Sequence, residues 1–224
     1  MSKGEDTAPG VMPIDREAWL RQLDLSNFVN SYYQYRDISR LIGVKKILVV
    51  GPGQGLDTAV FRWRGYDVLT LDVDRTFSPN VVGSVHDLTA FGDAEFDAVI
   101  ASHVLEHLPP KYLDTALREI ARVSRYALVY LPVNGRVARV RFQPAVLGID
   151  WSMTLNLRNP FVRPDPDVAN FCNGQHYWEV GTKGFKNREL RARFERDFDL
   201  LDCYHNPDWL PSMNYVLGSR RHSA

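Results

Sequence analysis

Cysteine is scarce in this 224-residue chain, and its two copies, Cys172 and Cys203, lie far apart. Isolated cysteines do not form the paired spacings that bind structural zinc. A single disulfide between them is the alternative to free thiols, but small disulfide-built domains need more cysteines than two. We therefore expect free thiols in a reducing compartment, the cytoplasm.

Long hydrophobic runs and an excess of either charge are also missing. No apolar run approaches the roughly 18 residues that a membrane-spanning helix needs, and the polar start MSKGEDTAPG does not resemble a signal or transit peptide. Lysine plus arginine balances aspartate plus glutamate, 27 against 27. We therefore expect neither a membrane nor a nucleic acid as partner.

The most informative stretch of the sequence is residues 47–74. A β-branched apolar run at 46–50 predicts a buried parallel strand, and apolar positions at helical spacing predict a helix over 56–64. A second apolar run at 68–72 predicts another strand. The stretch therefore predicts a strand–turn–helix–strand unit.

The turn of this unit is rich in glycine, with Gly51, Gly53 and Gly55 in a G-x-G-x-G spacing, and the second strand ends in Asp72. Glycines let a ligand approach the backbone closely, and the following helix start offers free N–H groups. A carboxylate at the end of the second strand is placed to bind ribose hydroxyls. A plain turn in an α/β protein is the alternative interpretation of the glycines alone.

Two further segments follow in order: VVGSVHDL at 81–88 and FDAVIASHVLEHL at 96–108. Together with the glycine turn, they resemble the class I S-adenosylmethionine-dependent methyltransferases, in particular the small-molecule, type 11-like family. The resemblance covers about residues 46–131 and is weaker to the end. It implies an α/β fold with a doubly wound, mostly parallel seven-stranded sheet and an antiparallel C-terminal hairpin, with S-adenosyl-L-methionine as cofactor.

The resemblance also implies the residues that hold the cofactor. Asp72 would bind the ribose and Asp87 the adenine amino group, while the glycines would admit the methionine part. Val49 departs from the family pattern, which has an acid at this position. The implied contacts are Gly51, Pro52, Gly53, Gly55, Asp72, Val73, His86, Asp87, Leu88, Ser102 and His103.

The chain is predicted to form one domain over 14–224 after a disordered start at 1–13. Residues 14–41 predict two helical pieces, capped by Asp15 and Ser26, that would form a lid over the cleft. The lid candidates are Tyr32, Tyr33 and Arg36, although the tyrosines would serve equally to pack this helix on the sheet.

Residues 134–180 are interpreted as an insertion on the substrate side. Their arginines favour an anionic or polar acceptor, because guanidinium pairs well with carboxylate and phosphate, although a solvated surface loop is the alternative. His176, in a run of aromatic residues, is our candidate general base, with a buried structural role as its alternative. The arginines are Arg136, Arg139, Arg141, Arg158 and Arg163.

The segment HVLEH places His103, Glu106 and His107 in a spacing known from zinc peptidases. The segment is too short for a zinc-binding helix, and no downstream acid stands out as a third ligand. We therefore predict no metal. His107 is a second catalytic candidate, with a structural hydrogen bond as the alternative, and Glu106 and His107 would brace or cap the next turn.

The sequence thus predicts methyl transfer from S-adenosylmethionine to a small polar or anionic acceptor, with a hydroxyl, for example of a sugar, as the favoured target. The alternatives are a non-catalytic binding protein of the same fold, which Val49 favours, and an NAD-dependent oxidoreductase. A homodimer is one possible assembly.

Overall fold

The computed structural model describes residues 23–142, 151–157, 163–209 and 211–222. The predicted disordered start and the helix that Asp15 would cap lie outside these residues, as does Arg158. Within the described part, no helix combines the length and the hydrophobicity needed to cross a bilayer.

A seven-stranded sheet forms the centre of the molecule, with the strand order β3-β2-β1-β4-β5-β9-β8. The pairs among β1 to β5 are parallel, whereas β9 is antiparallel to both β5 and β8. This arrangement confirms the predicted mixed sheet with an antiparallel hairpin at its edge. The strands are β1 (Lys46–Val50), β2 (Asp67–Asp72), β3 (Val81–Val82), β4 (Phe96–Ser102), β5 (Ser124–Pro132), β8 (Phe198–His205) and β9 (Ser212–Ser219).

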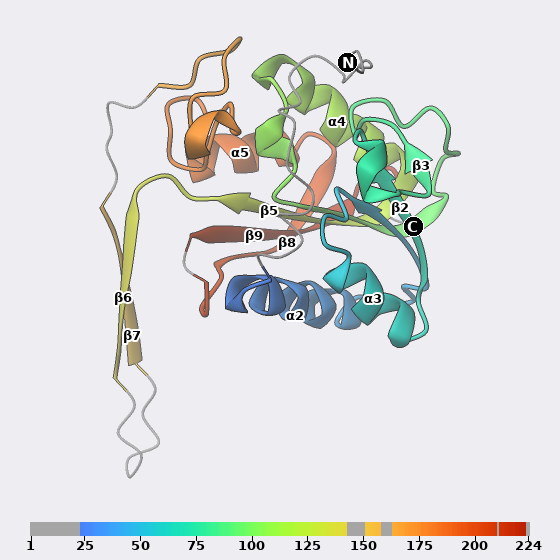
Figure 1. Cartoon of the computed structure of the whole chain (residues 1–224), viewed down its shortest axis with the longest axis horizontal. Coiled ribbons are helices and arrows are strands. Elements are labelled where there is room, and N and C mark those ends of the chain that lie inside the picture. Colours follow the sequence, from blue (N-terminus) through green and yellow to red (C-terminus); the bar gives the residue numbers. More distant parts are fainter. Residues whose placement is uncertain (1–22, 143–150, 158–162, 210, 223–224) are drawn as a thin grey trace, which may run out of the picture.

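Helices cover both faces of the sheet (Figure 1). One layer holds α2 (Leu25–Ser39) and α3 (Leu56–Trp63), and the other holds α4 (Pro110–Val123) and α5 (Asn187–Phe194). The strands alternate their side chains between two hydrophobic clusters, one on each face, so β1 is buried on both sides. Two short 3-10 turns near the site are η1 (Arg75–Phe77) and η2 (Leu105–His107), and a third is η3 (Cys172–Gly174).

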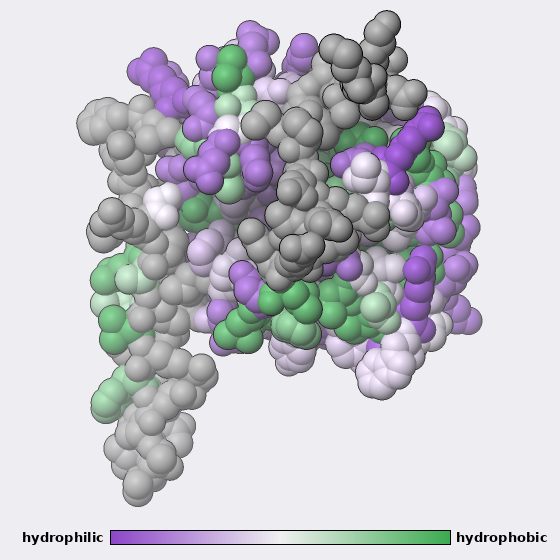
Figure 2. Space-filling model, viewed as in Figure 1, coloured by the Kyte–Doolittle hydropathy of each residue, from purple (hydrophilic) through white to green (hydrophobic). Residues whose placement is uncertain are grey.

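A two-stranded antiparallel ribbon, β6 (Arg136–Phe142) and β7 (Trp151–Leu157), forms a separate sheet. It extends away from the central sheet (Figure 1), and it carries exposed hydrophobic side chains at Val140 and Met153 (Figure 2). The ribbon belongs to the segment that we interpret as an insertion.

Helix α2 begins two residues earlier than the sequence predicted. Asp24, rather than Ser26, is its N-cap: the Asp24 carboxylate accepts from the backbone N–H of Ser26 at 2.9 Å and of Asn27 at 3.3 Å. The Asn27 side chain accepts in return from the Asp24 N–H at 2.9 Å. Aspartate satisfies the free N–H groups of the first turn as well as serine does, so the two candidates could not be separated by residue type.

A buried carboxylate attaches α2 to the sheet. Asp37 accepts the hydroxyl protons of Tyr130 at 2.6 Å and Tyr204 at 2.5 Å, which come from β5 and β8. Arg36 donates to the other oxygen of Asp37 from Nε at 2.9 Å and Nη2 at 2.7 Å. The carboxylate is therefore fully partnered although its residue is only 2% exposed.

Replacement of Asp37 with alanine is expected to lower the free energy of unfolding by about 3 kcal/mol or more, because it strips the Arg36 charge and two buried hydroxyls of their partner. Urea unfolding followed by circular dichroism measures this. The matched control is Asp199→Ala, which removes an exposed pair with Arg220 at 2.7 Å and should cost under about 1 kcal/mol. Equal losses in the two variants would contradict the role given to Asp37.

Candidate cofactor site

The candidate site lies at the carboxyl ends of β1, β2 and β4. The order of the sheet reverses between β1 and β4, and ligands of open α/β sheets bind in the crevice at such a point. Two pockets open there, and Gly51 lines both of them.

The first, which we name the β2 pocket, lies beside the end of β2. The Asp72 carboxylate there accepts the N–H of Asp74 at 2.9 Å, and its pKa is raised by burial and by the charge of Asp74. The ring of His86 stacks on Tyr112 with centroids 4.5 Å apart, which gives the pocket a flat aromatic wall. Its lining is Val50, Gly51, Asp72, Val73, Gly83, Ser84, Val85, His86, Val104, His107, Leu108, Pro109 and Tyr112.

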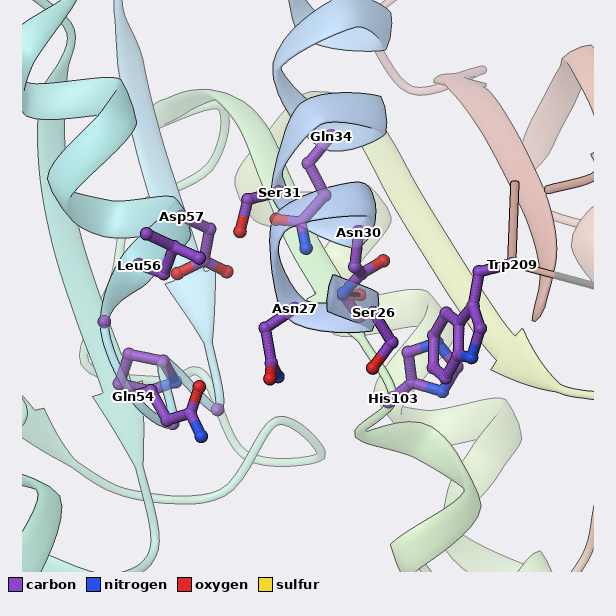
Figure 3. A pocket seen from close by; sticks show the side chains of 15 residues that line it. Ser26, Asn27, Asn30, Ser31, Gln34, Gln54, Leu56, Asp57, His103 and Trp209 are labelled. Carbon is purple, nitrogen blue, oxygen red and sulfur yellow. Dashed lines mark hydrogen bonds between the residues drawn. The ribbon is translucent and has the colours of Figure 1, made fainter. Parts of the chain in front are cut away.

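The second, which we name the α2 pocket, lies between the glycine turn and helix α2 (Figure 3). Helix α2 contributes a polar stripe at helical spacing, which closes the pocket from one side. His103 and Trp209 close its other end, with ring centroids 4.8 Å apart. Its lining is Ser26, Asn27, Asn30, Ser31, Gln34, Gly51, Pro52, Gly53, Gln54, Gly55, Leu56, Asp57, Ser102, His103 and Trp209.

Several groups in the α2 pocket are suited to a charged ligand. Asn30 Oδ1 and Gln34 Oε1 are buried and accept no hydrogen bond from the described residues. Burial raises the pKa of Asp57 to about 6, although hydrogen bonds from Thr58 and Gln34 act in the opposite direction and lower it. In Figure 3, Asp57 and Gln34 face each other between α3 and α2. The ammonium group of an amino acid would donate the hydrogen bonds that these two oxygens lack.

The glycine turn leaves room for a ligand and admits no side chain at its first position. Gly51 has φ +64°, and a Cβ there would lie 2.6 Å from Cγ2 of Val104. Gly53 and Gly55 also have positive φ, at 51° and 75°. The cradle and the unpaired oxygens beside it fit the cofactor that the sequence predicted, because the amino-acid part needs acceptors and the ribose needs a carboxylate.

Most predicted cofactor residues lie together in the two pockets, but two do not line either of them. Asp87 is exposed, and its carboxylate accepts the hydroxyl of Thr89 at 2.7 Å, while the side chain of Leu88 is fully buried in the core. Val49 is also buried, on the α2–α3 face of the sheet. The lining residues are Gly51, Pro52, Gly53, Gly55, Asp72, Val73, His86, Ser102 and His103.

The lid candidates face away from the cleft. Tyr33 is buried and its hydroxyl donates to Asp208 at 2.6 Å, Tyr32 is exposed, and Arg36 pairs with Asp37. The face of α2 that does line the pocket was missed, although its signal was present: Asn27, Asn30, Ser31 and Gln34 follow the i, i+3, i+4, i+7 pattern. Trp209 was also missed, because nothing local in the sequence sets it apart. Asp57 was set aside on the sequence because, just inside the helix, it is not at a position equivalent to Val49.

A cluster of three histidines around one carboxylate adjoins these pockets. Glu106 is fully buried on η2, with His103 Nδ1 at 3.5 Å from its Oε1. The rings of His107 and His176 meet edge to face with centroids 4.8 Å apart. His176 Nδ1 lies 2.9 Å from Oε1 of Glu179, and His107 Nδ1 lies 3.0 Å from the carbonyl oxygen of Gln175. The two candidate catalytic histidines thus lie side by side, from distant parts of the chain.

Backbone geometry fixes this cluster. His103 has φ +55°, which few non-glycine residues adopt, and its N–H donates to Tyr130 O at 2.9 Å. The N–H of Tyr177 donates to Glu106 O at 2.9 Å, which joins η2 to the segment that bears His176. Glu106 does not cap α4 as the sequence suggested, since that helix begins after Pro109 without a side-chain cap. Burial lowers the pKa of His107, so its ring stays neutral at neutral pH.

Comparison with known proteins gives a family match over part of the chain and the fold of the whole. Residues 48–126 match a family model described as a methyltransferase domain. A search of curated proteins finds no match to the chain. The fold is shared with the sugar N-methyltransferase KedS8 from Streptoalloteichus sp ATCC 53650, at 12% identity and a TM-score of 0.59, over 98% of this chain and 99% of that one.

Two further structures share the fold. One is the 1,6-didemethyltoxoflavin-N1-methyltransferase of Burkholderia thailandensis, solved with S-adenosylhomocysteine, at 21% identity and a TM-score of 0.51, covering 95% and 92% of the two chains. The other is a TehB-like SAM-dependent methyltransferase from Corynebacterium glutamicum ATCC 13032 Kitasato, at 17% identity and a TM-score of 0.54, covering 92% and 94%. The family model thus indicates a methyltransferase domain over residues 48–126, and these structures show that the chain shares their fold.

Proposed function

We propose that this enzyme transfers the methyl group of S-adenosylmethionine to a hydroxyl group of a small polar or anionic acceptor. The observation that carries the proposal is the cluster of Glu106, His107 and His176 beside the two pockets. A hydroxyl must lose its proton as it accepts the methyl group. The lone pairs on the imidazole nitrogens and carboxylate oxygens of this cluster favour that loss. An amine is the second candidate acceptor, because KedS8 is named as a sugar N-methyltransferase.

The cofactor would span both pockets. Its ribose would bind Asp72 and its adenine would lie along His86 and Tyr112 in the β2 pocket. Its amino-acid part would enter the α2 pocket, where the ammonium group meets Asp57 and Gln34. The sulfonium would then lie near Gly51, which both pockets share, so the methyl group points to the histidine cluster. The reaction is an in-line displacement whose rate depends mainly on orientation.

Replacement of Asp72 with alanine should abolish cofactor binding, because the ribose hydroxyls lose their carboxylate acceptor. Calorimetric titration with S-adenosylmethionine measures this, and titration of the native protein with NAD tests the oxidoreductase alternative. Asp74→Ala is a matched control on the same loop, since Asp74 lines neither pocket. Unchanged affinity in Asp72→Ala would contradict the ribose site.

Asp57 is expected to take the part of the acidic residue that is absent at position 49. Because Asp57 must be ionised for this, cofactor affinity should depend on pH. The carboxyl with a pKa of about 6 must be ionised to pair with the ammonium group. Below pH 6 the affinity should therefore fall by up to about tenfold per pH unit. Asp57→Asn should weaken binding about tenfold at neutral pH and remove the slope between pH 5 and 7. A slope that persists in Asp57→Asn would assign it to another group.

The glycine cradle gives a third test of the cofactor's position. Gly51→Ala should lose measurable cofactor binding, because its Cβ would clash with Val104 and fill the junction of the pockets. Gly65→Ala is the matched control: it has φ +85° and nothing within 4 Å of its Cβ. Both variants should lose about 1–2 kcal/mol of stability from backbone strain, but Gly65→Ala should bind normally. Normal binding by Gly51→Ala would place the cofactor elsewhere.

A further inference from the structure

The Glu106 carboxylate is buried among three histidines. Its side chain is 0% exposed, and neither oxygen accepts a hydrogen bond from the part of the chain that the structure describes. The nearest cation candidate, His103 Nδ1, is 3.5 Å from Oε1, at the outer limit of such contacts. An unpaired buried carboxylate is costly, so its oxygens point to a cation that binds there.

The surrounding side chains supply the remaining ligands. One ligand atom each from Glu106, His107 and His176 lies within 4.8 Å of the other two. Atoms that are each about 2.0–2.2 Å from one ion lie about 3.3–3.6 Å apart in a tetrahedral site, so the side chains must close by up to about 1.5 Å when the ion binds. The HVLEH segment alone offered no third ligand, whereas the structure brings one from 69 residues downstream of His107, as a histidine rather than an acid.

The hydrogen bonds fix both histidines in the form that binds metals. Nδ1 of His107 faces a backbone carbonyl oxygen, which only accepts, so Nδ1 carries the proton and Nε2 keeps a free lone pair. Nδ1 of His176 likewise donates to the carboxylate of Glu179, which is held in turn by Asn134 Nδ2 at 2.9 Å. Such carboxylate–histidine pairs orient metal-binding rings and raise their basicity.

We propose that Glu106, His107 and His176 bind one divalent first-row metal ion beside the methyl-transfer site. Two imidazoles and one carboxylate suit Zn²⁺, Mn²⁺, Fe²⁺ or Co²⁺ better than Mg²⁺ or Ca²⁺, which prefer oxygen ligands alone. Three protein ligands leave positions open, which is typical of a catalytic site rather than a structural one. The exposed His107 lines the β2 pocket and gives the ion a route from solvent.

The open positions would receive the acceptor's hydroxyl, a role that rests on the proposed function. A bound hydroxyl has a lowered pKa and releases its proton to solvent as an alkoxide forms on the ion. The alkoxide oxygen then bonds to the methyl carbon as the carbon–sulfur bond breaks, and that electron pair stays on sulfur to give S-adenosylhomocysteine. In this arrangement His176 is a metal ligand and not the general base that the sequence suggested.

The test begins with metal binding, independent of activity. The chelator-treated protein is titrated with Co²⁺ and, separately, with Zn²⁺ and Mn²⁺, and binding is followed by calorimetry and by the visible absorption of Co²⁺. We expect one ion per chain with nitrogen ligation. Glu106→Gln and His107→Ala should each weaken binding at least tenfold. His222→Ala is the matched control, because that histidine binds Arg122 O at 2.8 Å outside the cluster.

Cofactor titration of the same samples separates the two proposals. His107 is the ligand most exposed to solvent, so His107→Ala should fold even if Glu106→Gln does not. His176→Ala reports on the cofactor, because His176 lines neither pocket. Metal binding that is lost in both histidine variants, with S-adenosylmethionine binding retained in His176→Ala, supports the site. No metal binding by the native chain, or equal binding by His107→Ala and His222→Ala, overturns the metal site and leaves a histidine–carboxylate proton relay. Failure of the native chain to bind S-adenosylmethionine would instead count against the cofactor placement.

Discussion

The reversal of strand order between β1 and β4 is the constraint on which the rest of the structure depends. Because β2 and β4 lie on opposite sides of β1, the chain must leave β1 on one face of the sheet and reach α4 on the other. The loops after these strands therefore diverge, and the edge between them stays open. The glycine turn, Asp72 and His103 all lie at this edge, although up to about 50 residues separate them in sequence.

Helix α2 turns the open edge into a cleft. It lies outside the alternating strand–helix pattern, so its position depends on tertiary contacts, chiefly the buried Asp37 and its two tyrosines from β5 and β8. With that face fixed to the sheet, the polar stripe that includes Asn30 and Gln34 is turned toward the glycine turn. One face of the helix thus serves stability and the other serves the ligand.

The sequence predicted the strands and helices well, because the spacing of apolar residues and the glycines in turns are local signals. The elements β1, α3 and β2 each begin and end within one residue of the predicted positions. The same local signals placed residues such as Asp72 at the strand ends, where the structure has a pocket. The sequence did not predict which face of α2 would meet the cleft. The helix carries both tyrosines and amides, and either set could pack on the sheet or line the cleft. Asp87 stays a prediction: its carboxylate accepts the hydroxyl of Thr89, two residues away, and lines neither pocket.

Under the proposed function, Asp57 takes the part of the acid that is absent at position 49. An acid at that position would sit on a buried strand, whereas Val49 contributes apolar packing between the sheet and its helices. Asp57 offers a carboxylate in the first turn of α3, where burial raises its pKa to about 6. A group held near its ionisation point in the free protein gains most from a cationic ligand, since pairing removes the cost of its buried charge. Glu106 is buried more completely than Asp57, and His103 Nδ1 lies 3.5 Å from its Oε1. Burial opposes its charge, but the contact with His103 and the charges of the neighbouring histidines lower the pKa of Glu106 below its usual range, so the carboxylate is ionised and attracts a cation.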